Sequence, residues 1–112
     1  MKLIKGAIAL PLSIALNFLS LPAAEARQVD VSSVNYVYQL DSDATVFEFN
    51  STVPHACGSS LYQVHSPNEA VANRKFSLVL AAFTTKSNLV FHDTETCVGN
   101  RSVVGWVRIT HN

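Results

Sequence analysis

The first 26 residues of this chain have the pattern of a secretory signal peptide, and this pattern limits what remains to fold. Lys2 and Lys5 give a positively charged start, and a mostly apolar run follows from residue 6 to residue 21. The run leads to Ala24-Glu25-Ala26, which has small residues where signal peptidases require them. We therefore expect cleavage after Ala26 and export of residues 27–112.

A permanent membrane anchor is the alternative interpretation of the same segment. Pro11, Asn17 and Ser20 interrupt the apolar run, whereas a spanning helix needs about 20 predominantly apolar residues. No later stretch of the chain approaches that length. The sequence therefore predicts a secreted or periplasmic protein that has no membrane segment once the signal is removed.

The mature segment is small. Removing 26 of the 112 residues leaves 86, which suits a single domain with a thin hydrophobic core. Six basic and seven acidic side chains remain, so the formal net charge is −1. Binding of nucleic acid requires a clustered basic face, and attraction to anionic membranes requires a polybasic segment. The composition predicts neither partner.

Two cysteines, Cys57 and Cys97, lie in the mature segment, 40 positions apart. In an oxidising compartment an isolated pair most simply forms one disulfide. Closing a loop of this length stabilises the fold by an amount on the order of 4 kcal/mol. We predict this bond, and we expect the thin core to depend on it.

Alternation of apolar and polar residues predicts the β-strands. The first predicted strand changes parity at Ser32-Ser33, which we interpret as a bulge. The last is apolar on both faces, as expected of a central strand or of one covered by a partner. The five predicted strands are residues 29–40, 45–52, 61–65, 89–92 and 103–110.

One helix is predicted between the third and fourth strands. Ser66-Pro67-Asn68-Glu69 has the form of a capping box with proline at the first helical position. An apolar stripe at helical spacing follows, so we expect a helix over residues 67–85. Residues 93–101 read as a polar loop that contains Cys97.

The resulting order is β-β-β-α-β-β, mainly β with one helix. This order predicts a small five-stranded OB-like barrel, with the helix closing one end. The alternative is an open antiparallel sheet with one packed helix, an α+β arrangement. In both cases the predicted disulfide ties the loop before the third strand to the loop after the fourth.

Three short segments between residues 57 and 109 carry a resemblance to a known family: Cys57-Gly58-Ser59, Leu80-Ala81-Ala82-Phe83 and Cys97-Val98-Gly99-Asn100-Arg101. In their order and spacing they resemble small secreted bacterial proteins similar to the B subunits of AB-type toxins. The resemblance implies an OB-fold, assembly into rings and binding of cell-surface glycans. It supplies no binding residues, because it includes no sugar-binding signature.

Metal and thiol chemistry are not expected. The mature segment has four histidines and two cysteines but no C-x-x-C or H-x-x-x-H spacing. The predicted disulfide also removes the free thiolate that a Cys57–His92 nucleophile pair would need. We therefore predict no metal, no cofactor and no catalytic residue. The four histidines are His55, His65, His92 and His111.

The segment His92-Asp93-Thr94-Glu95 groups an imidazole with two carboxylates. It is the candidate site if the protein is a small periplasmic enzyme or inhibitor. The alternative is a solvated loop at the end of a strand, which is common in small domains.

Trp106 and Tyr62 are the candidate ligand-binding residues, because an aromatic ring offers a sugar an apolar face with a polar rim. The alternative is that both rings belong to the core or to a subunit interface. Together these patterns favour an exported, non-enzymatic binding domain with a glycan or protein partner, forming a homo-oligomer as the resemblance implies. A small enzyme or inhibitor, or an envelope structural protein without a ligand, are the alternatives.

Overall fold

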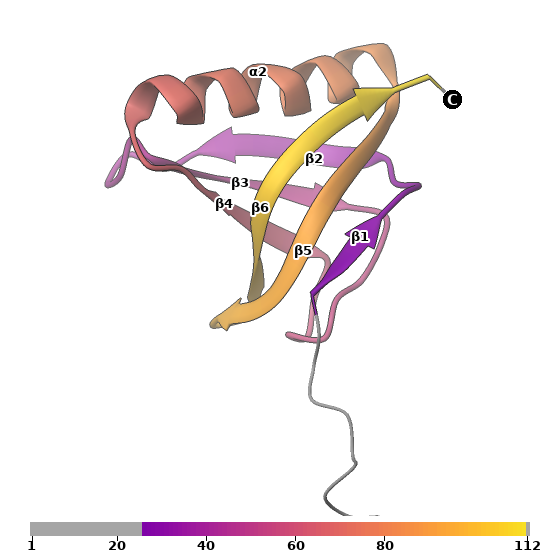
Figure 1. The fold of residues 1–112 in the computed structure, drawn as a ribbon, viewed down its shortest axis with the longest axis horizontal. Helices are drawn as coiled ribbons and strands as arrows, with labels where there is room; N and C mark the ends of the chain where they lie inside the picture. Colours follow the sequence, from indigo (N-terminus) through magenta and orange to yellow (C-terminus); the bar gives the residue numbers. More distant parts are fainter. Residues whose placement is uncertain (1–25, 112) are drawn as a thin grey trace, which may run out of the picture.

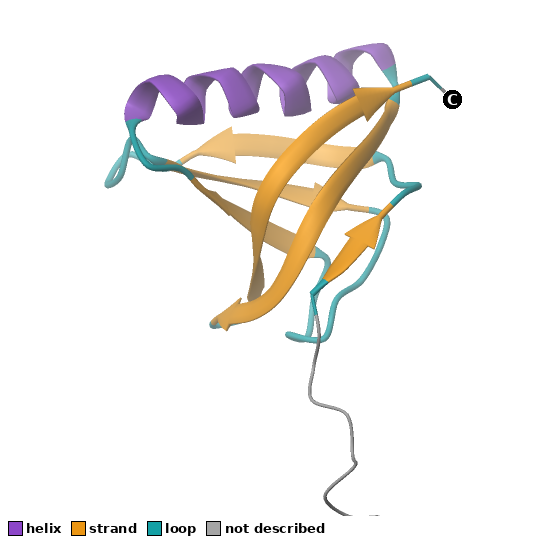
Figure 2. Ribbon diagram, viewed as in Figure 1, coloured by secondary structure: helices purple, strands orange, loops and turns teal. Residues whose placement is uncertain are grey.

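The computed structural model describes residues 26–111, so the predicted signal peptide, apart from Ala26, lies outside the described residues. The fold is mainly β with one helix (Figures 1 and 2). No helix within residues 26–111 has the length and apolar character needed to cross a membrane. The elements are β1 Arg27–Val29, β2 Val34–Gln39, β3 Val46–Ser51, β4 Leu61–His65, α2 Glu69–Thr85, β5 Asn88–Val98 and β6 Arg101–Thr110.

The six strands form one open mixed sheet in the order β1-β5-β6-β4-β3-β2. Neighbouring strands are antiparallel except β4 and β6, which run parallel with α2 as the crossover between β4 and the β5–β6 hairpin. The helix lies across one side of the sheet and contacts β6 and β2 (Figure 1). The predicted closed five-stranded barrel is not confirmed. The alternative, an open sheet with a packed helix, is confirmed, although the sheet is mixed rather than antiparallel.

The predicted first strand is divided into β1 and β2, which lie at opposite edges of the strand order. Ser32 bonds to β5: its amide donates to Asn88 Oδ1 at 2.8 Å and its hydroxyl donates to the Leu89 carbonyl at 2.7 Å. The carbonyl of Ser33 accepts from the amide of Thr52, just after β3, at 3.0 Å. The parity change at these serines therefore marks a crossing between sheet edges. It is not the bulge within one strand that the sequence predicts.

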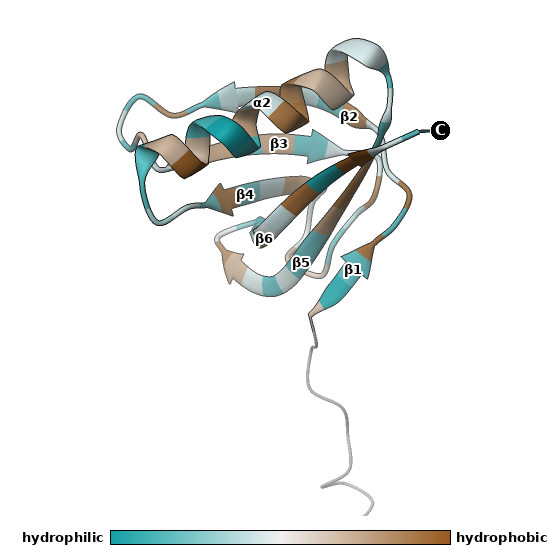
Figure 3. Ribbon diagram, turned by 45° about the horizontal axis from the view of Figure 1, so that its top comes forward, coloured by the Kyte–Doolittle hydropathy of each residue, from teal (hydrophilic) through white to brown (hydrophobic). Residues whose placement is uncertain are grey.

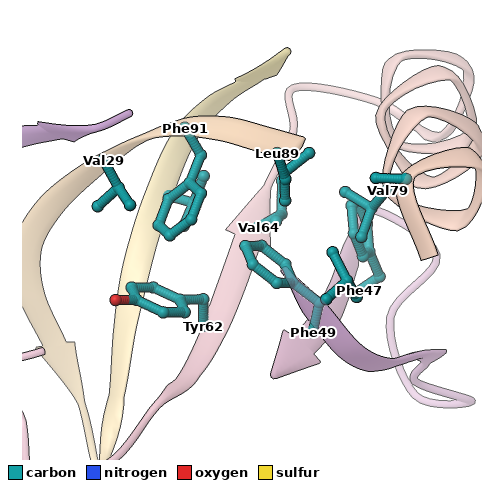
Figure 4. Packing of buried hydrophobic residues seen from close by; sticks show 11 residues of the cluster. Val29, Phe47, Phe49, Tyr62, Val64, Val79, Leu89 and Phe91 are labelled. Carbon is teal, nitrogen blue, oxygen red and sulfur yellow. The ribbon is translucent and has the colours of Figure 1, made fainter. Parts of the chain in front are cut away.

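The core fills the space between the curved sheet and the helix (Figure 4). Its centre is aromatic: Phe49 and Phe91 meet edge to face at 5.2 Å, and Phe49 stacks on Tyr62 at 5.4 Å. Val79 contributes from α2 (Figure 4). Figure 3 shows both apolar and polar residues along the strands, and β5 has three consecutive apolar residues near its start, all of them buried.

The helix begins two residues later than predicted. Its N-cap is Asn68, whose backbone is extended and whose Oδ1 accepts from the Val71 amide at 2.9 Å. The hydroxyl of Ser66, the predicted cap, is buried and has no hydrogen-bond partner. At the other end Lys86 adopts a left-handed conformation with φ of 56°, and its amide bonds to the Ala82 carbonyl.

The predicted loop over residues 93–101 is mostly strand. β5 continues to Val98, the chain turns at Gly99 with φ of 60°, and β6 begins at Arg101. Cys97 therefore lies in the ladder opposite Ser102. β6 lies between β5 and β4, which confirms that the strand with two apolar faces is central.

The predicted disulfide between Cys57 and Cys97 is confirmed, with a Cα–Cα distance of 5.6 Å. It ties the segment between β3 and β4 to the end of β5. Cys57 is partly buried and Cys97 is exposed.

We expect a variant with both Cys57→Ser and Cys97→Ser to lose about 4 kcal/mol of unfolding free energy, because the unfolded chain gains the entropy of an unclosed loop. Denaturant unfolding of the oxidised wild type and the variant measures this difference, and reduced wild type is the control. A loss below about 1 kcal/mol would contradict the chain-entropy argument.

Replacing Asn68 with alanine removes the N-cap acceptor and is expected to lower the unfolding free energy by about 1 kcal/mol. Ser66→Ala is the matched control: it removes a buried hydroxyl without a partner, so stability stays equal or rises. Thermal unfolding of the two variants separates the cases. Destabilisation by Ser66→Ala alone would instead support the capping box.

Candidate functional site

A β-bulge in β6 determines where Trp106 lies. Gly105 and Trp106 together lie opposite His92 of β5, so β6 has one extra residue at this point. The extra residue shifts the alternation, and Val104 and Val107 both pack in the core. Trp106 is consequently excluded from the core and is 37% exposed.

Two side chains lie against the Trp106 ring. The imidazole of His92 stacks on it, with ring centroids 6.2 Å apart and planes 12° from parallel. The guanidinium carbon of Arg108 lies 5.8 Å from the ring centroid, which is the geometry of a cation–π contact. Gly105 makes room for this arrangement, because a Cβ at this position would lie 3.0 Å from His92 Nδ1.

A second cation approaches the bulge from the helix. Lys75 Nζ donates to the Gly105 carbonyl at 3.1 Å and to the His65 carbonyl at 3.3 Å. Burial lowers the pKa of this ammonium group, since its environment solvates the charge less well than water does. We define the Trp106 surface as Trp106, His92, Arg108, Gly105 and Lys75.

A polar network surrounds Glu48 on β3. The side chain lies on the face opposite the core phenylalanines, yet the residue is only 1% exposed because its neighbours cover it. Arg101 Nε donates to one carboxylate oxygen at 2.9 Å, and Gln63 Nε2 donates to the same oxygen at 2.8 Å. The hydroxyl of Tyr38 donates to the other oxygen. We define the Glu48 network as these four residues.

The environment keeps Glu48 ionised. Burial alone would raise the pKa of Glu48, but the hydrogen bonds from Arg101, Tyr38 and Gln63 outweigh burial and hold it below its ordinary value. The Gln63 side chain also contacts His65 Nε2 at 2.6 Å through its Oε1. Because the carbonyl of His65 accepts from Lys75, the network is continuous with the Trp106 surface.

Tyr62, the second residue predicted to stack on a sugar, lies in the core with 0% exposure. Its hydroxyl donates to the Val53 carbonyl at 2.8 Å. Burial raises the pKa of Tyr62 to about 12. The ring presents no face to solvent, so Tyr62 is a core residue and cannot stack on a sugar in this structure. A core position is the alternative that the sequence analysis gave for it.

The side chains of His92, Asp93 and Glu95 do not converge on one site. Asp93 is buried and accepts from Arg27 Nε at 3.1 Å and from the hydroxyl of Ser102. The Glu95 carboxylate lies 3.6 Å from Arg27. His92 contacts Trp106, whereas Asp93, the next residue along the strand, is buried. The predicted loop is a strand, and this separates the imidazole from both carboxylates.

His55 and Ser59 form the one histidine–serine contact within the described residues, with Nε2 and Oγ 3.3 Å apart. His55 Nδ1 accepts from the Cys57 amide at 3.0 Å, which places the proton on Nε2, where it points to the Leu61 carbonyl at 2.8 Å. The Ser59 hydroxyl donates to the Asn100 carbonyl at 2.5 Å. The imidazole therefore does not accept the hydroxyl proton, and the pair holds the disulfide-bonded segment in place.

No metal site forms in the part of the chain that the structure describes: nowhere do three His, Cys, Asp or Glu side chains meet in a way that would hold an ion. A hollow of about 350 Å³ between the β2–β3 turn and the start of α2 is lined by Asp41, Asp43 and Glu69, among others. Asp43 bonds to the amide and hydroxyl of Thr45 and so stabilises the turn.

Sequence reasoning selected Trp106 and, for a different role, His92, but it missed Arg108 and Lys75. Arg108 is two positions away on the same strand, and this spacing was available as a signal. Lys75 reaches the bulge from the helix, and no local pattern connects it to β6. The Glu48 network could have been suspected from Glu48 itself, an acidic residue between two phenylalanines of a predicted strand, Phe47 and Phe49.

In comparisons with protein families, curated proteins and solved structures, nothing was found to match the chain. The resemblance to toxin B subunits stays a prediction. A functional assignment depends on the geometry of the Trp106 surface and the Glu48 network.

Glu48→Gln is expected to destabilise the fold by about 2 kcal/mol at neutral pH, because Arg101 loses its charged partner. The folded pKa of Glu48 lies below its ordinary value of 4.5, so the stabilisation is complete above pH 4.5 and is lost as pH falls through the folded pKa. The difference between wild type and variant should therefore shrink on acidification. The test measures the unfolding free energies of wild type and Glu48→Gln from neutral pH to below 4.5. A difference between the two that does not change with pH contradicts the prediction.

Proposed function

We propose that the chain is an exported, non-enzymatic binding domain that binds a glycan at the Trp106 surface. The observation that carries this proposal is the bulge at Gly105 and Trp106, which leaves a tryptophan exposed on a central strand. Sugars bind to proteins by packing their apolar faces on aromatic rings while polar groups bond to their hydroxyls. Arg108 and His92 supply such polar groups at the ring, and Lys75 adds an ammonium group at the neighbouring Gly105 carbonyl.

The site is held rigidly, which favours binding. Paired strands carry His92 and the bulge with Trp106, and Lys75 joins the bulge to the end of β4 through two carbonyls. The Glu48 network fixes the neighbouring outer face with a fully bonded carboxylate. A preorganised surface loses less conformational entropy when a ligand binds.

The finer assignment of the fold belongs to the same proposal: an incompletely closed OB-like arrangement related to toxin B subunits. Strands β2 to β6 follow the predicted order, with the helix between β4 and β5. Bonds from Ser32 to β5 and from Ser33 to the end of β3 bring the two edges of the open sheet together. The analogy with toxin B subunits favours binding over catalysis, and the site itself has to supply the function.

Export and self-association are further parts of the proposal. A disulfide fits an oxidising compartment such as the periplasm or the extracellular space. Leu80 and Phe83 of α2 and Val31 before β2 are exposed apolar residues that suit a contact between copies of the chain. Light scattering of the purified mature protein measures the oligomeric state. A monomer at high concentration would contradict the proposed self-association.

The glycan proposal is tested on a glycan array. We expect the folded wild type to bind and Trp106→Ala to weaken binding about 30-fold or more, as for a central aromatic contact residue. Tyr36→Ala, which removes another exposed aromatic ring, on β2, is the matched control and should bind normally. Failure of the wild type to bind any glycan, together with its recovery in envelope fractions, would instead favour a structural envelope protein.

A further inference from the structure

The charged side chains that contact Trp106 and the bulge beside it are cationic. Arg108 lies over the ring, and Lys75 bonds to the Gly105 carbonyl. No ion pair of residues 26–111 joins a carboxylate to Arg108 or to Lys75. This contrasts with the Glu48 network, where the guanidinium and the carboxylate compensate each other.

We infer that the Trp106 surface selects sugars that carry a negatively charged group, namely a carboxylate, sulfate or phosphate. The inference rests on the proposed function and specifies its ligand class. The ring of Trp106 would contact the apolar face of the sugar, and Arg108 would contact the charged substituent.

Arg108 has the donors that such a group needs. A guanidinium presents several N–H groups in a plane that matches the oxygens of carboxylate, sulfate or phosphate. The Arg108 side chain donates no hydrogen bond within the described residues, and it contacts the Trp106 ring. The ammonium of Lys75 has three hydrogens and gives two of them to the Gly105 and His65 carbonyls. The arginine is therefore the principal free donor at this site.

The size of the site favours a sugar over a nucleic acid. Only one tryptophan exists in the chain, and the formal net charge is zero. Binding to a phosphate backbone requires an extended basic face that neutralises many phosphates. One ring with one cation over it and a second at the neighbouring backbone matches one or two charged sugar residues.

The test uses the purified mature protein and pairs of glycans that are identical except for one carboxylate, sulfate or phosphate group. Trp106 is the only tryptophan, so its fluorescence reports binding at the surface itself. We expect the charged member of a pair to bind about tenfold or more tightly, with an affinity that falls as salt is added. Comparison of the three anions shows which one the site prefers.

Variants at Arg108 decide whether the arginine causes the preference. Arg108→Gln should weaken binding of the charged glycan about tenfold more than it weakens binding of the uncharged one, so that the preference for the charged member is lost. Arg74→Gln removes the same charge from an exposed position on α2 and is the matched control. Arg108→Lys keeps the charge but not the planar donors, so it should recover only part of the affinity.

The outcomes separate this inference from the proposed function. Equal binding of charged and uncharged glycans, or an unchanged preference in Arg108→Gln, overturns the inference and leaves glycan binding intact. Absence of binding to every glycan overturns both. A change in Trp106 fluorescence on adding charged glycans, which needs about tenfold more glycan in Arg108→Gln, supports both the inference and the proposed function.

Discussion

The parallel contact between β4 and β6 joins the two halves of this sheet, and the remaining structure depends on it. The strands β2, β3 and β4 form one antiparallel unit, and β5, β6 and β1 form the other. The two meet over three residue pairs, which is a short register for a central joint. Three kinds of interaction reinforce it: the Cys57–Cys97 disulfide, the Arg101–Glu48 ion pair and the Lys75 bridge between two strand ends. Each of these joins the two halves across the same boundary, so the sheet is reinforced at the short contact between β4 and β6.

The candidate site lies beside this joint. Lys75 bonds to the last residue of β4 and to the bulge of β6, so it couples the position of Trp106 to the contact between the two halves. The bulge also explains how a strand with two apolar faces is accommodated. One extra residue lets Val104 and Val107 both face inward and places the largest side chain of the strand outside.

Local patterns in the sequence predicted much of the fold, and long-range pairing accounts for most of the errors. The bounds of β4, the end of the helix and the disulfide were predicted correctly. The extension of β5 to Val98 was missed because its polar residues pair with β6 without covering the core. The burial of Tyr62 agrees with the alternative given for it, a place in the core. The division at Ser32-Ser33 was missed because it depends on strands distant in sequence. At the site, Trp106 was identified by residue type, while Lys75 and Arg108 became relevant only through the bulge.

The order of the strands has a consequence for the folding pathway. Strands β2, β3 and β4 are joined by short connections and pair locally, whereas β4 and β6 meet only after the whole helix and β5 have been made. Contacts between residues distant in sequence form late, because the chain must first lose the entropy of closing a long loop. The pairing of β4 with β6 is thus the late step. Until this pairing is complete, one side of β4 has no partner strand. The disulfide links Cys57, just before β4, to Cys97, just before β6, so its formation brings the two strands close together and shortens the loop that remains to be closed.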